Sequence, residues 1–314
     1  MRTTLTLLAA LVLLASCNQY KKTPSGLAYK ITGNSKEKLK HGQFVKLNIE
    51  FKIAPRDTVF KSSFGHVPAF TMIDTSRVPK HSFMEVITKV GEGDKLEFVM
   101  SVDTLKKYGD LDYNEIFHAH DQIKGKLEIL KVYKSQEEAA ADRMKELDIE
   151  KQKEIKDIQA FVAKKGIKTQ STRSGALVEI EKAGDAAVKA DTGKVASILY
   201  KGFLLSKPDG KPFDYNTDPG KPLLNVLVGS QGSSSPQGMS VIPGLDEALR
   251  MFGKGGKGKV YIPAMLGYGD AGSPPVIPEY SNLLFEVEVV DVKDAPPPAP
   301  VPVQPAPIGQ PKRK

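Results

Sequence analysis

Histidine and cysteine, which carry much of nucleophilic and metal-dependent catalysis, occur only in the first part of this 314-residue chain. All five histidines lie at or before position 120, and the single cysteine is Cys17. His118 and His120, followed by Asp121, could begin a metal site, but no third or fourth ligand is evident, so a solvated loop is favoured. Residues 166–293 therefore lack the side chains for Ser-His, Cys-His or His-metal chemistry, and we expect neither a metal nor a cofactor.

A glycine-rich stretch at residues 253–259 imitates two phosphate-binding patterns. Gly253, Gly255 and Gly258 fit G-x-G-x-x-G. The run also fits most of G-x-x-x-x-G-K, but Val260 stands where a Ser or Thr hydroxyl is required. Both patterns work by placing a strand before the glycines and a helix after them, so that helix N–H groups meet phosphate. Here the expected order is the reverse, and we interpret the glycines as a connecting turn.

Residues 190–291 instead hold a series of apolar and aromatic segments with few polar groups. In order, these segments are residues 199–202 (LYKG), 209–214 (DGKPFD), 241–249 (VIPGLDEAL), 262–269 (IPAMLGYG), 277–278 (IP) and 283–287 (LLFEV). Each segment alone is typical of a protein core. Together, in this order and spacing, they resemble the FKBP-type peptidyl-prolyl isomerases, through the Y-x-G strand end, the D-G-K-x-F-D turn, V-I-x-G, the Y-G loop and the L-x-F-x-V strand.

The resemblance implies a five- or six-stranded antiparallel sheet wrapped on a short helix, with an apolar pocket between them. Matched position by position, the catalytic residues would be Tyr200, Phe213, Asp214 and Tyr268. The substrate-binding residues would be Leu224 (or Leu223), Val241, Ile242, Leu245, Ile277 and Phe285. In the implied roles, the Ile242 amide and the Tyr268 hydroxyl hold peptide carbonyls, while Asp214 polarises the twisted amide and pairs with Tyr200. The alternative is that Asp214 only caps a turn and Tyr200 is core.

The chemistry of such a pocket needs no nucleophile. Rotation about an X–Pro bond faces a barrier of about 18–20 kcal/mol because amide resonance must be broken. An apolar pocket that grips the proline ring favours the twisted, less polar amide over the solvated planar one, and preorganised donors stabilise it further. The lack of histidine in this half of the chain is consistent with that mechanism.

Several positions depart from the family pattern. Leu245 occupies the pocket floor, where a tryptophan is usual, and the chain has no tryptophan. A leucine replaces the usual phenylalanine of one wall, and Ser273 replaces a common histidine. The Gly- and Ser-rich loop 229–240 is also longer than usual. We expect a shallower or wider pocket that binds macrolide inhibitors less well.

The start of the chain resembles a bacterial lipoprotein signal. A basic start is followed by an apolar run, Leu5 to Leu14, that is too short to span a bilayer as a mature helix. Residues 14–17 (LASC) then resemble a lipobox, which implies cleavage before Cys17 and lipid modification of that cysteine. An ordinary secretory signal with a chance cysteine is the alternative. The lipid-anchor hypothesis places the protein in the cell envelope, with inner and outer membrane left open.

The spacing of apolar residues predicts the strands and helices that position the candidate site residues. Val45, Leu47 and Ile49 alternate with polar residues, as do Phe285, Val287 and Val289, which predicts half-buried strands. A helix is predicted over Leu245–Phe252, and helical spacing is also seen at 83–90. Residues 135–165, free of Gly and Pro, predict a mostly exposed connecting helix. The Pro-rich basic tail cannot bury a core and is predicted to be disordered.

The predicted fold class is α+β, with two FKBP-like domains joined by a long charged helix. The predicted segments are a signal peptide (1–16), a lipidated tether (17–25), a degenerate FKBP-like domain (26–133), a linker helix (134–165), an isomerase domain (166–293) and the tail (294–314). The two halves share an order of strands around a short helix, which indicates a diverged internal duplication. In the first half Phe51 is matched to Tyr200, Phe60 to Phe213 and Lys61 to Asp214, so an inactive copy is expected.

The composition restricts the classes of molecule that the protein is expected to bind. The net charge is +8, but the lysines are scattered and no Arg-rich, aromatic-interleaved patch appears, so nucleic-acid binding is not expected. We expect proline-containing unfolded or exported polypeptides as substrates and contact with a membrane through the lipid anchor. Two functions stay open: an isomerase that assists folding in the envelope, and a non-catalytic module that binds clients with both domains. Asp214 and Tyr268 favour the first, and Leu245 favours the second.

Overall fold

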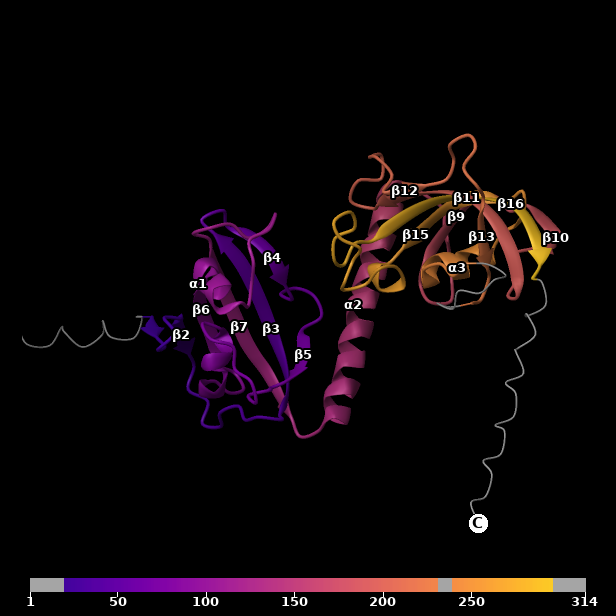
Figure 1. Ribbon diagram of the computed structural model, residues 1–314. Coiled ribbons are helices and arrows are strands. Elements are labelled where there is room, and N and C mark those ends of the chain that lie inside the picture. The colour runs from indigo at the N-terminus through magenta and orange to yellow at the C-terminus, as the bar shows by residue number, and fades with distance from the viewer. Residues whose placement is uncertain (1–19, 231–238, 296–314) are drawn as a thin grey trace, which may run out of the picture. The chain divides into compact units, whose positions relative to one another are not determined.

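The computed structural model describes residues 20–230 and 239–295, and the chain divides into two compact units, Met1–Glu150 and Lys151–Lys314 (Figure 1). The division falls inside helix α2 (Gln136–Lys164). Each unit is a mixed structure of antiparallel strands with short helices, which confirms the predicted α+β class. The predicted signal peptide, Cys17 and most of the Pro-rich tail lie outside the described residues.

The first unit is built on one seven-stranded antiparallel sheet. Its elements are β1 (Lys21–Lys22), β2 (Ala28–Thr32), β3 (Phe44–Ala54), β4 (Thr58–Ser62), β5 (Ala69–Met72), the 3-10 helices η1 (Phe83–Glu85) and η2 (Ile87–Lys89), β6 (Lys95–Ser101), α1 (Val102–Tyr108) and β7 (Gln122–Tyr133). The strand order is β1-β2-β6-β7-β3-β4, with β5 paired to β3.

The second unit repeats this architecture. Its elements are β8 (Gln170–Ser171), β9 (Leu177–Lys182), β10 (Asp185–Lys189), β11 (Lys194–Leu204), β12 (Asp214–Tyr215), β13 (Leu224–Leu227), α3 (Pro243–Leu249), β14 (Gly253–Lys254), β15 (Lys257–Ile262), the 3-10 helix η3 (Ala264–Leu266) and β16 (Leu283–Asp294). The sheet order is β8-β9-β15-β16-β11-β12, with β13 paired to β11, and β10 and β14 form a separate ribbon.

The two sheets share an irregularity as well as a strand order. In the first, the pairing of β3 with β7 shifts between Lys46 and Leu47. In the second, the pairing of β11 with β16 shifts between Ser197 and Ile198. Each shift leaves one extra residue on the longer final strand, which is the geometry of a β-bulge. A common bulge in a common topology supports the internal duplication.

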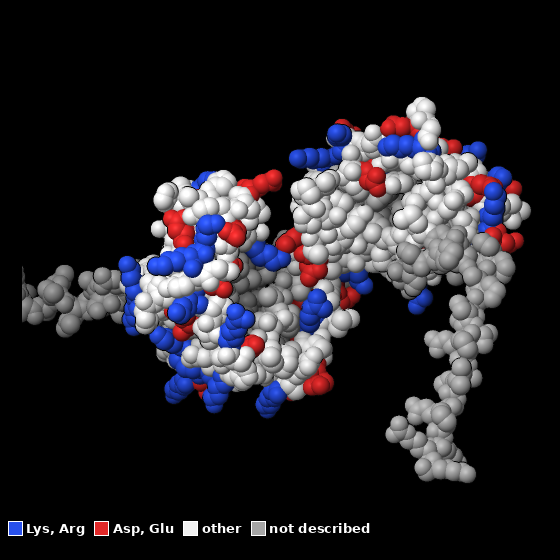
Figure 2. Space-filling model, in the orientation of Figure 1, with Lys and Arg blue, Asp and Glu red and all other residues white. Residues whose placement is uncertain are grey.

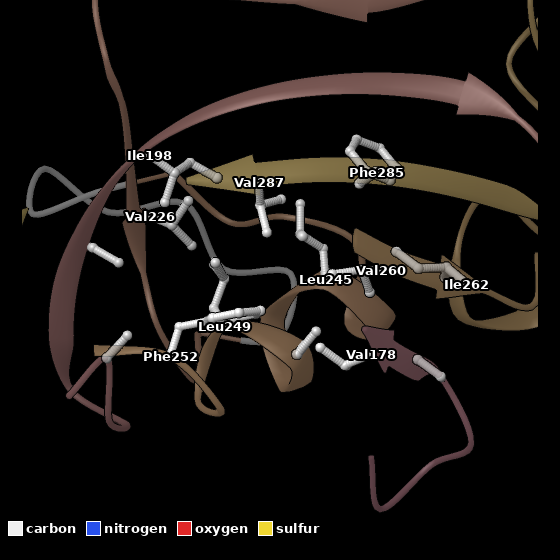
Figure 3. Close-up of a cluster of buried hydrophobic side chains, with 14 of the residues drawn as sticks. Val178, Ile198, Val226, Leu245, Leu249, Phe252, Val260, Ile262, Phe285 and Val287 are labelled. Carbon is white, nitrogen blue, oxygen red and sulfur yellow. The ribbon is translucent and has the colours of Figure 1, made fainter. Parts of the chain in front are cut away.

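The core of the second unit lies between α3 and the inner face of its curved sheet. Figure 3 shows Leu245 and Leu249 of α3 among side chains from the strands, including Phe285 and Val287 of β16. The helix begins at Pro243, which needs no N–H partner at a first helical position, and ends at Leu249. The predicted helix Leu245–Phe252 is therefore displaced by two or three residues at each end.

Helices in the first unit differ more from the prediction. The helical spacing at 83–90 corresponds to two separate 3-10 turns, η1 and η2, interrupted at Val86, whose φ and ψ are −123° and 3°. The β-branched run Val86, Ile87, Thr88 favours this irregular path over a continuous helix. The first unit also contains helix α1, which was not predicted although Ser101 caps its start and Gly109, at φ 80°, ends it.

Most residues of helix α2 are exposed, as predicted, but the helix also makes buried contacts within each unit. Within the first unit, Asp142 of the helix accepts hydrogen bonds from the Tyr133 hydroxyl at 2.6 Å and from Lys46 at 3.1 Å. Within the second unit, Ile158 and Val162 pack in a buried cluster on the outer face of the sheet, with Leu177, Phe203, Leu205, Tyr261 and Leu284. Polar residues between these contacts interrupt the apolar pattern of the helix, so the buried stripe could not be recognised in the sequence.

Candidate functional site

A pocket of about 490 Å³ opens beside the start of α3. Its lining consists of Tyr200, Phe213, Asp214, Leu224, Met239, Ser240, Val241, Ile242, Leu245, Tyr268 and Phe285. The structure thus brings together all of the predicted site residues except Ile277. Leu245 is 3% exposed and joins the pocket to the core, as a floor residue would.

The polar rim of the pocket is formed by Tyr200, Asp214 and Tyr268. The Tyr200 hydroxyl donates a hydrogen bond of 2.7 Å to Oδ2 of Asp214. Burial and this hydrogen bond raise the pKa of Tyr200, and burial with the nearby Asp214 charge raises the pKa of Tyr268. Both phenols therefore stay protonated at neutral pH, and each can donate a hydrogen bond.

Pairing of β11 with β12 holds Asp214 at this rim. Gly202 is the Cα partner of Asp214, and the Phe213 N–H donates to the Gly202 carbonyl at 2.8 Å. Gly202 is required here because a Cβ would lie 2.6 Å from Cζ of Phe213 and 3.0 Å from Cε1 of Phe285. The rings of Phe213 and Phe285 meet edge to face, with centroids 5.7 Å apart and an interplanar angle of 82°. The result is an apolar wall with a carboxylate at its edge.

The entry to α3 exposes a backbone donor to the pocket. Ile242, with φ −56° and ψ 144°, is the N-cap residue, and its carbonyl accepts from the Leu245 and Asp246 N–H groups. Among residues 20–230 and 239–295, no group accepts a hydrogen bond from the Ile242 N–H. Such a donor at the edge of an apolar pocket is available to a peptide carbonyl.

Ile277 does not line the pocket. Its side chain is 4% exposed and belongs to the adjacent core cluster. Its N–H and carbonyl exchange hydrogen bonds of 2.9 and 2.8 Å with Ser273, closing a turn after Tyr268. Leu224 lines the pocket, whereas Leu223 is 37% exposed and lies outside the lining.

Other contributors were not found from the sequence. Met239 and Ser240 line the pocket directly before the V-I-x-G segment, so their adjacency to that motif was the signal available. Asn216 is buried, accepts from the Tyr200 N–H at 2.8 Å and donates to the Ile198 carbonyl at 3.0 Å, which anchors the chain after Asp214. Glu154 of α2 accepts from the Met265 N–H at 2.9 Å and so supports the loop that carries Tyr268.

Strand register aligns the first unit with this site. With the shared bulge as reference, Ile49 corresponds to Tyr200 and Phe51 to Gly202. The match of Phe51 with Tyr200 is therefore wrong by two residues. The Cα partner of Phe51 on β4 is Lys61, as that of Gly202 on β12 is Asp214, so Lys61 does stand at the Asp214 position.

Aromatic rings occupy the pocket position in the first unit. Phe51 faces Gly125 across β3 and β7, whereas Gly202 faces Phe285 across β11 and β16, so phenylalanine and glycine have changed places. Phe98, which is 1% exposed, lies beside Gly125, where a Cβ would come within 1.9 Å of its Cζ. The Phe98 ring lies 5.9 Å from Phe51 and 5.0 Å from Phe83.

The part of the chain that the structure describes contains neither a cluster of metal ligands nor a membrane-spanning helix. No group of three or more His, Cys, Asp or Glu residues in it is arranged to hold a metal ion. His120 instead lies 3.1 Å from Asp103, and the Asp121 carboxylate accepts from the His118 N–H. None of the described helices is long and apolar enough to cross a membrane.

Comparison with known proteins gives one family. The family model for FKBP-type peptidyl-prolyl cis-trans isomerases matches residues 186–290. The FKBP-type isomerase FkpA of Escherichia coli is 42% identical over 136 residues, which cover 43% of this chain and 44% of that protein, less than half its length. A crystal structure of E. coli FkpA aligns with a TM-score of 0.37 and 28% identity, over 51% of this chain and 69% of that chain.

A second relative is matched over more of its length. A probable FKBP-type isomerase of Haemophilus influenzae is 36% identical over 181 residues, which cover 55% of this chain and 69% of that protein. The residues that carry the resemblance are the ones assembled around the pocket at α3. The chain belongs to the FKBP-type peptidyl-prolyl cis-trans isomerases.

Proposed function

We propose that the second unit catalyses cis–trans isomerisation of X–Pro bonds in unfolded, exported polypeptides. The observation that carries this proposal is the pairing of Tyr200 with Asp214 at the rim of an apolar pocket floored by Leu245. The proline ring enters the pocket between Phe213 and Phe285. Desolvation there favours the twisted amide, whose charge separation is lower than that of the planar amide.

In this proposal three groups of the chain act on the bound peptide. The Ile242 N–H donates to a peptide carbonyl and fixes the chain across the entry to α3. The Tyr268 hydroxyl, protonated at neutral pH, donates to a second carbonyl. Asp214, oriented by Tyr200, faces the amide whose carbonyl rotates and stabilises the rotated dipole. No proton leaves the enzyme in this cycle.

An isomerisation assay on Xaa-Pro peptides tests the proposal. The wild-type chain is compared with Asp214→Ala and Tyr268→Phe. Matched controls are Asp218→Ala, an exposed aspartate outside the pocket lining, and Tyr215→Phe, whose ring contacts Lys221 instead of the pocket. We expect loss of rate for the first two and a wild-type rate for the controls. A wild-type chain with no rate above the uncatalysed reaction contradicts the proposal.

The first unit supports a second function, binding of unfolded clients without catalysis. Its pocket position is occupied by rings, yet Val59, Phe60 and Ile116 are 45%, 36% and 50% exposed at the same end of the sheet. Exposed apolar side chains that gather in one place are typical of protein interaction sites. Suppression of aggregation of a denatured protein that contains no proline isolates this activity. Replacement of the three side chains by Ser should abolish the suppression and leave peptide isomerisation unchanged.

We also propose that the chain is anchored in the cell envelope through lipid on Cys17. The support is the sequence of residues 14–17 and the short apolar run before it. Cys17→Ala should release the protein from the membrane fraction, and continued membrane association of that variant refutes the anchor.

A further inference from the structure

A loop at one end of the first sheet presents several lysines around a cleft. The cleft, of about 770 Å³, is lined by residues 35–43, Glu92, Val132, Tyr133 and Lys134. Lys36, Lys38 and Lys40 occupy alternate positions of this loop and are exposed, as is Lys134. Figure 2 shows Lys and Arg side chains along the lower left margin of this unit.

The loop is held in place by one buried carboxylate. Asp94 is 1% exposed and accepts from the Ser35 and Gly91 N–H groups at 3.0 Å each and from Lys38 at 2.9 Å. The buried Leu39 side chain and a hydrogen bond of 2.8 Å from its N–H to the Val90 carbonyl fix the next residue. Lys36 and Lys40 therefore project from a rigid support instead of a flexible segment.

The charges of this surface are only partly balanced within the protein. Lys38 is paired with Asp94, and Glu92 accepts from the Val132 N–H at 2.8 Å. In the described parts of the chain, Lys36, Lys40 and Lys134 form no ion pair. Lys131, one residue before Val132 of the lining, is also exposed, and Lys21 and Lys22 are exposed on the edge strand β1. Its acidic members are fewer, so the surface fits an anionic partner.

The N-terminal end of strand β1 points toward the same end of the sheet. β1 runs antiparallel to β2, with Lys21 opposite Tyr29 and Lys22 opposite Ala28. Traced backwards from Lys21, the chain therefore points toward Thr32, the end of β2 that continues into the lysine loop. Cys17 precedes Tyr20 by three positions, a span of at most about 10 Å of extended chain.

We propose that this lysine surface rests on anionic phospholipid headgroups of the membrane in which Cys17 is anchored. The proposal depends on the lipid anchor and adds to it a defined orientation of the first unit. The partner is a phospholipid surface because the tether is too short to carry the lysine loop far from one. Each lysine near an anionic bilayer strengthens binding on the order of fivefold, and this attraction weakens with salt.

Site-specific fluorescence on reconstituted protein tests the orientation. The lipidated full chain has no other cysteine than Cys17, so an introduced cysteine gives a single labelling site. Asn34→Cys places an environment-sensitive probe on the lysine loop. Lys107→Cys places it on α1, which starts at the opposite end of β6. The vesicles contain phosphatidylcholine, with or without a minor share of phosphatidylglycerol, and a headgroup-attached quencher.

We expect quenching at position 34 to exceed quenching at 107 in phosphatidylglycerol vesicles. The excess should disappear in phosphatidylcholine alone, in high salt and in a Lys36→Gln, Lys40→Gln, Lys134→Gln variant. The control variant carries the probe at position 34 and loses the same number of charges at the opposite end of the sheet, through Lys80→Gln, Lys107→Gln and Lys124→Gln. Its quenching in phosphatidylglycerol vesicles should remain as strong as that of the parent protein.

Two different failures are distinguishable. Protein that floats with the vesicles but shows equal quenching at both positions, or quenching independent of phosphatidylglycerol, overturns the lysine surface and leaves the anchor intact. Protein that does not float with any vesicle refutes the anchor and the lysine surface together, while the isomerase assay is unaffected.

Discussion

The Tyr200 hydroxyl of β11 donates a hydrogen bond of 2.7 Å to the carboxylate of Asp214, the exposed first residue of β12. Asp214 is exposed and contributes nothing to the buried core, whereas the Tyr200 ring packs against Phe285 at 6.2 Å. The pair therefore couples a rigid aromatic residue to a carboxylate at the pocket edge. A carboxylate kept in one orientation at an exposed rim is a feature of binding or catalysis more than of folding.

The first prediction concerns Asp214 itself. In the proposed function Asp214 makes a charge-assisted interaction with the rotating amide, worth about 1.5–3 kcal/mol, so Asp214→Ala should lower kcat/KM about 10- to 100-fold. The unfolding free energy should change little because the carboxylate is exposed. Peptide isomerisation and urea unfolding measured on the same preparation separate the two effects. An equal loss of activity in Asp218→Ala would argue against a specific role.

The second prediction is a pH dependence of stability. Burial first, and then the hydrogen bond to Asp214, raise the pKa of Tyr200 in the folded protein above its ordinary value of about 10. The protonated phenol thus contributes stability that is complete below this value and is lost as the pH rises toward the folded pKa. Unfolding free energies should therefore fall as the pH rises above about 10, the unfolded pKa of tyrosine. Asp214→Asn should reduce that fall, and an unchanged slope would contradict the coupling.

The third prediction tests the pocket floor. Leu245→Ala removes a nearly fully buried side chain and should lower the unfolding free energy by about 2–5 kcal/mol. Leu245→Met conserves volume and should cost less than about 1.5 kcal/mol. Because the floor touches the proline ring in our proposal, Leu245→Ala should also raise KM for Xaa-Pro peptides, which a purely structural loss in the folded fraction would not do.

The fourth prediction compares two glycines at different places in the repeated fold. Gly202→Ala forces the rings of Phe213 and Phe285 apart, at a cost of about 1–3 kcal/mol, and should reduce isomerase activity. Gly125→Ala meets Phe98 and should destabilise only the first unit. Thermal unfolding with activity assays should therefore show lost activity for the first variant and an early, partial transition with full activity for the second.

The fifth prediction is that an acidic residue at position 61 does not give the first unit isomerase activity. Lys61→Asp recreates the carboxylate at the Asp214 position. In an Asp214→Ala background it should give no recovery of peptide isomerisation, because the rings of Phe51 and Phe98 occupy the pocket position. Recovery of activity in the double variant would show that a second pocket exists.

Local patterns predicted the site better than they predicted the connections around it. Tyr200, Phe213, Asp214 and the 241–245 segment belong to short motifs whose spacing determines their position, and the structure assembles them. Ile277 follows a turn closed by Ser273, and the direction of its side chain depends on that turn. Met239 and Ser240 carry no motif of their own, so only the folded chain shows that they reach the pocket.

The pairing and register of the strands could not be predicted from the sequence. The alternation at Val45, Leu47 and Ile49 predicted a strand but not its partner, and a two-residue error in matching Phe51 kept it on the same face of the sheet. Helix α1 was missed because its seven residues gave too short a periodic pattern. The contacts of α2 were missed because Ile158 and Val162 bury against strands far away in sequence.

The exchange of phenylalanine and glycine between the two copies has a consequence for their history. A side chain at position 125 collides with Phe98 while Phe98 remains, and removal of Phe98 first leaves a hole beside Phe51. Each of these two single steps therefore passes through a destabilised first unit. A side chain enters position 125 without a clash or a cavity only when positions 98 and 125 change together.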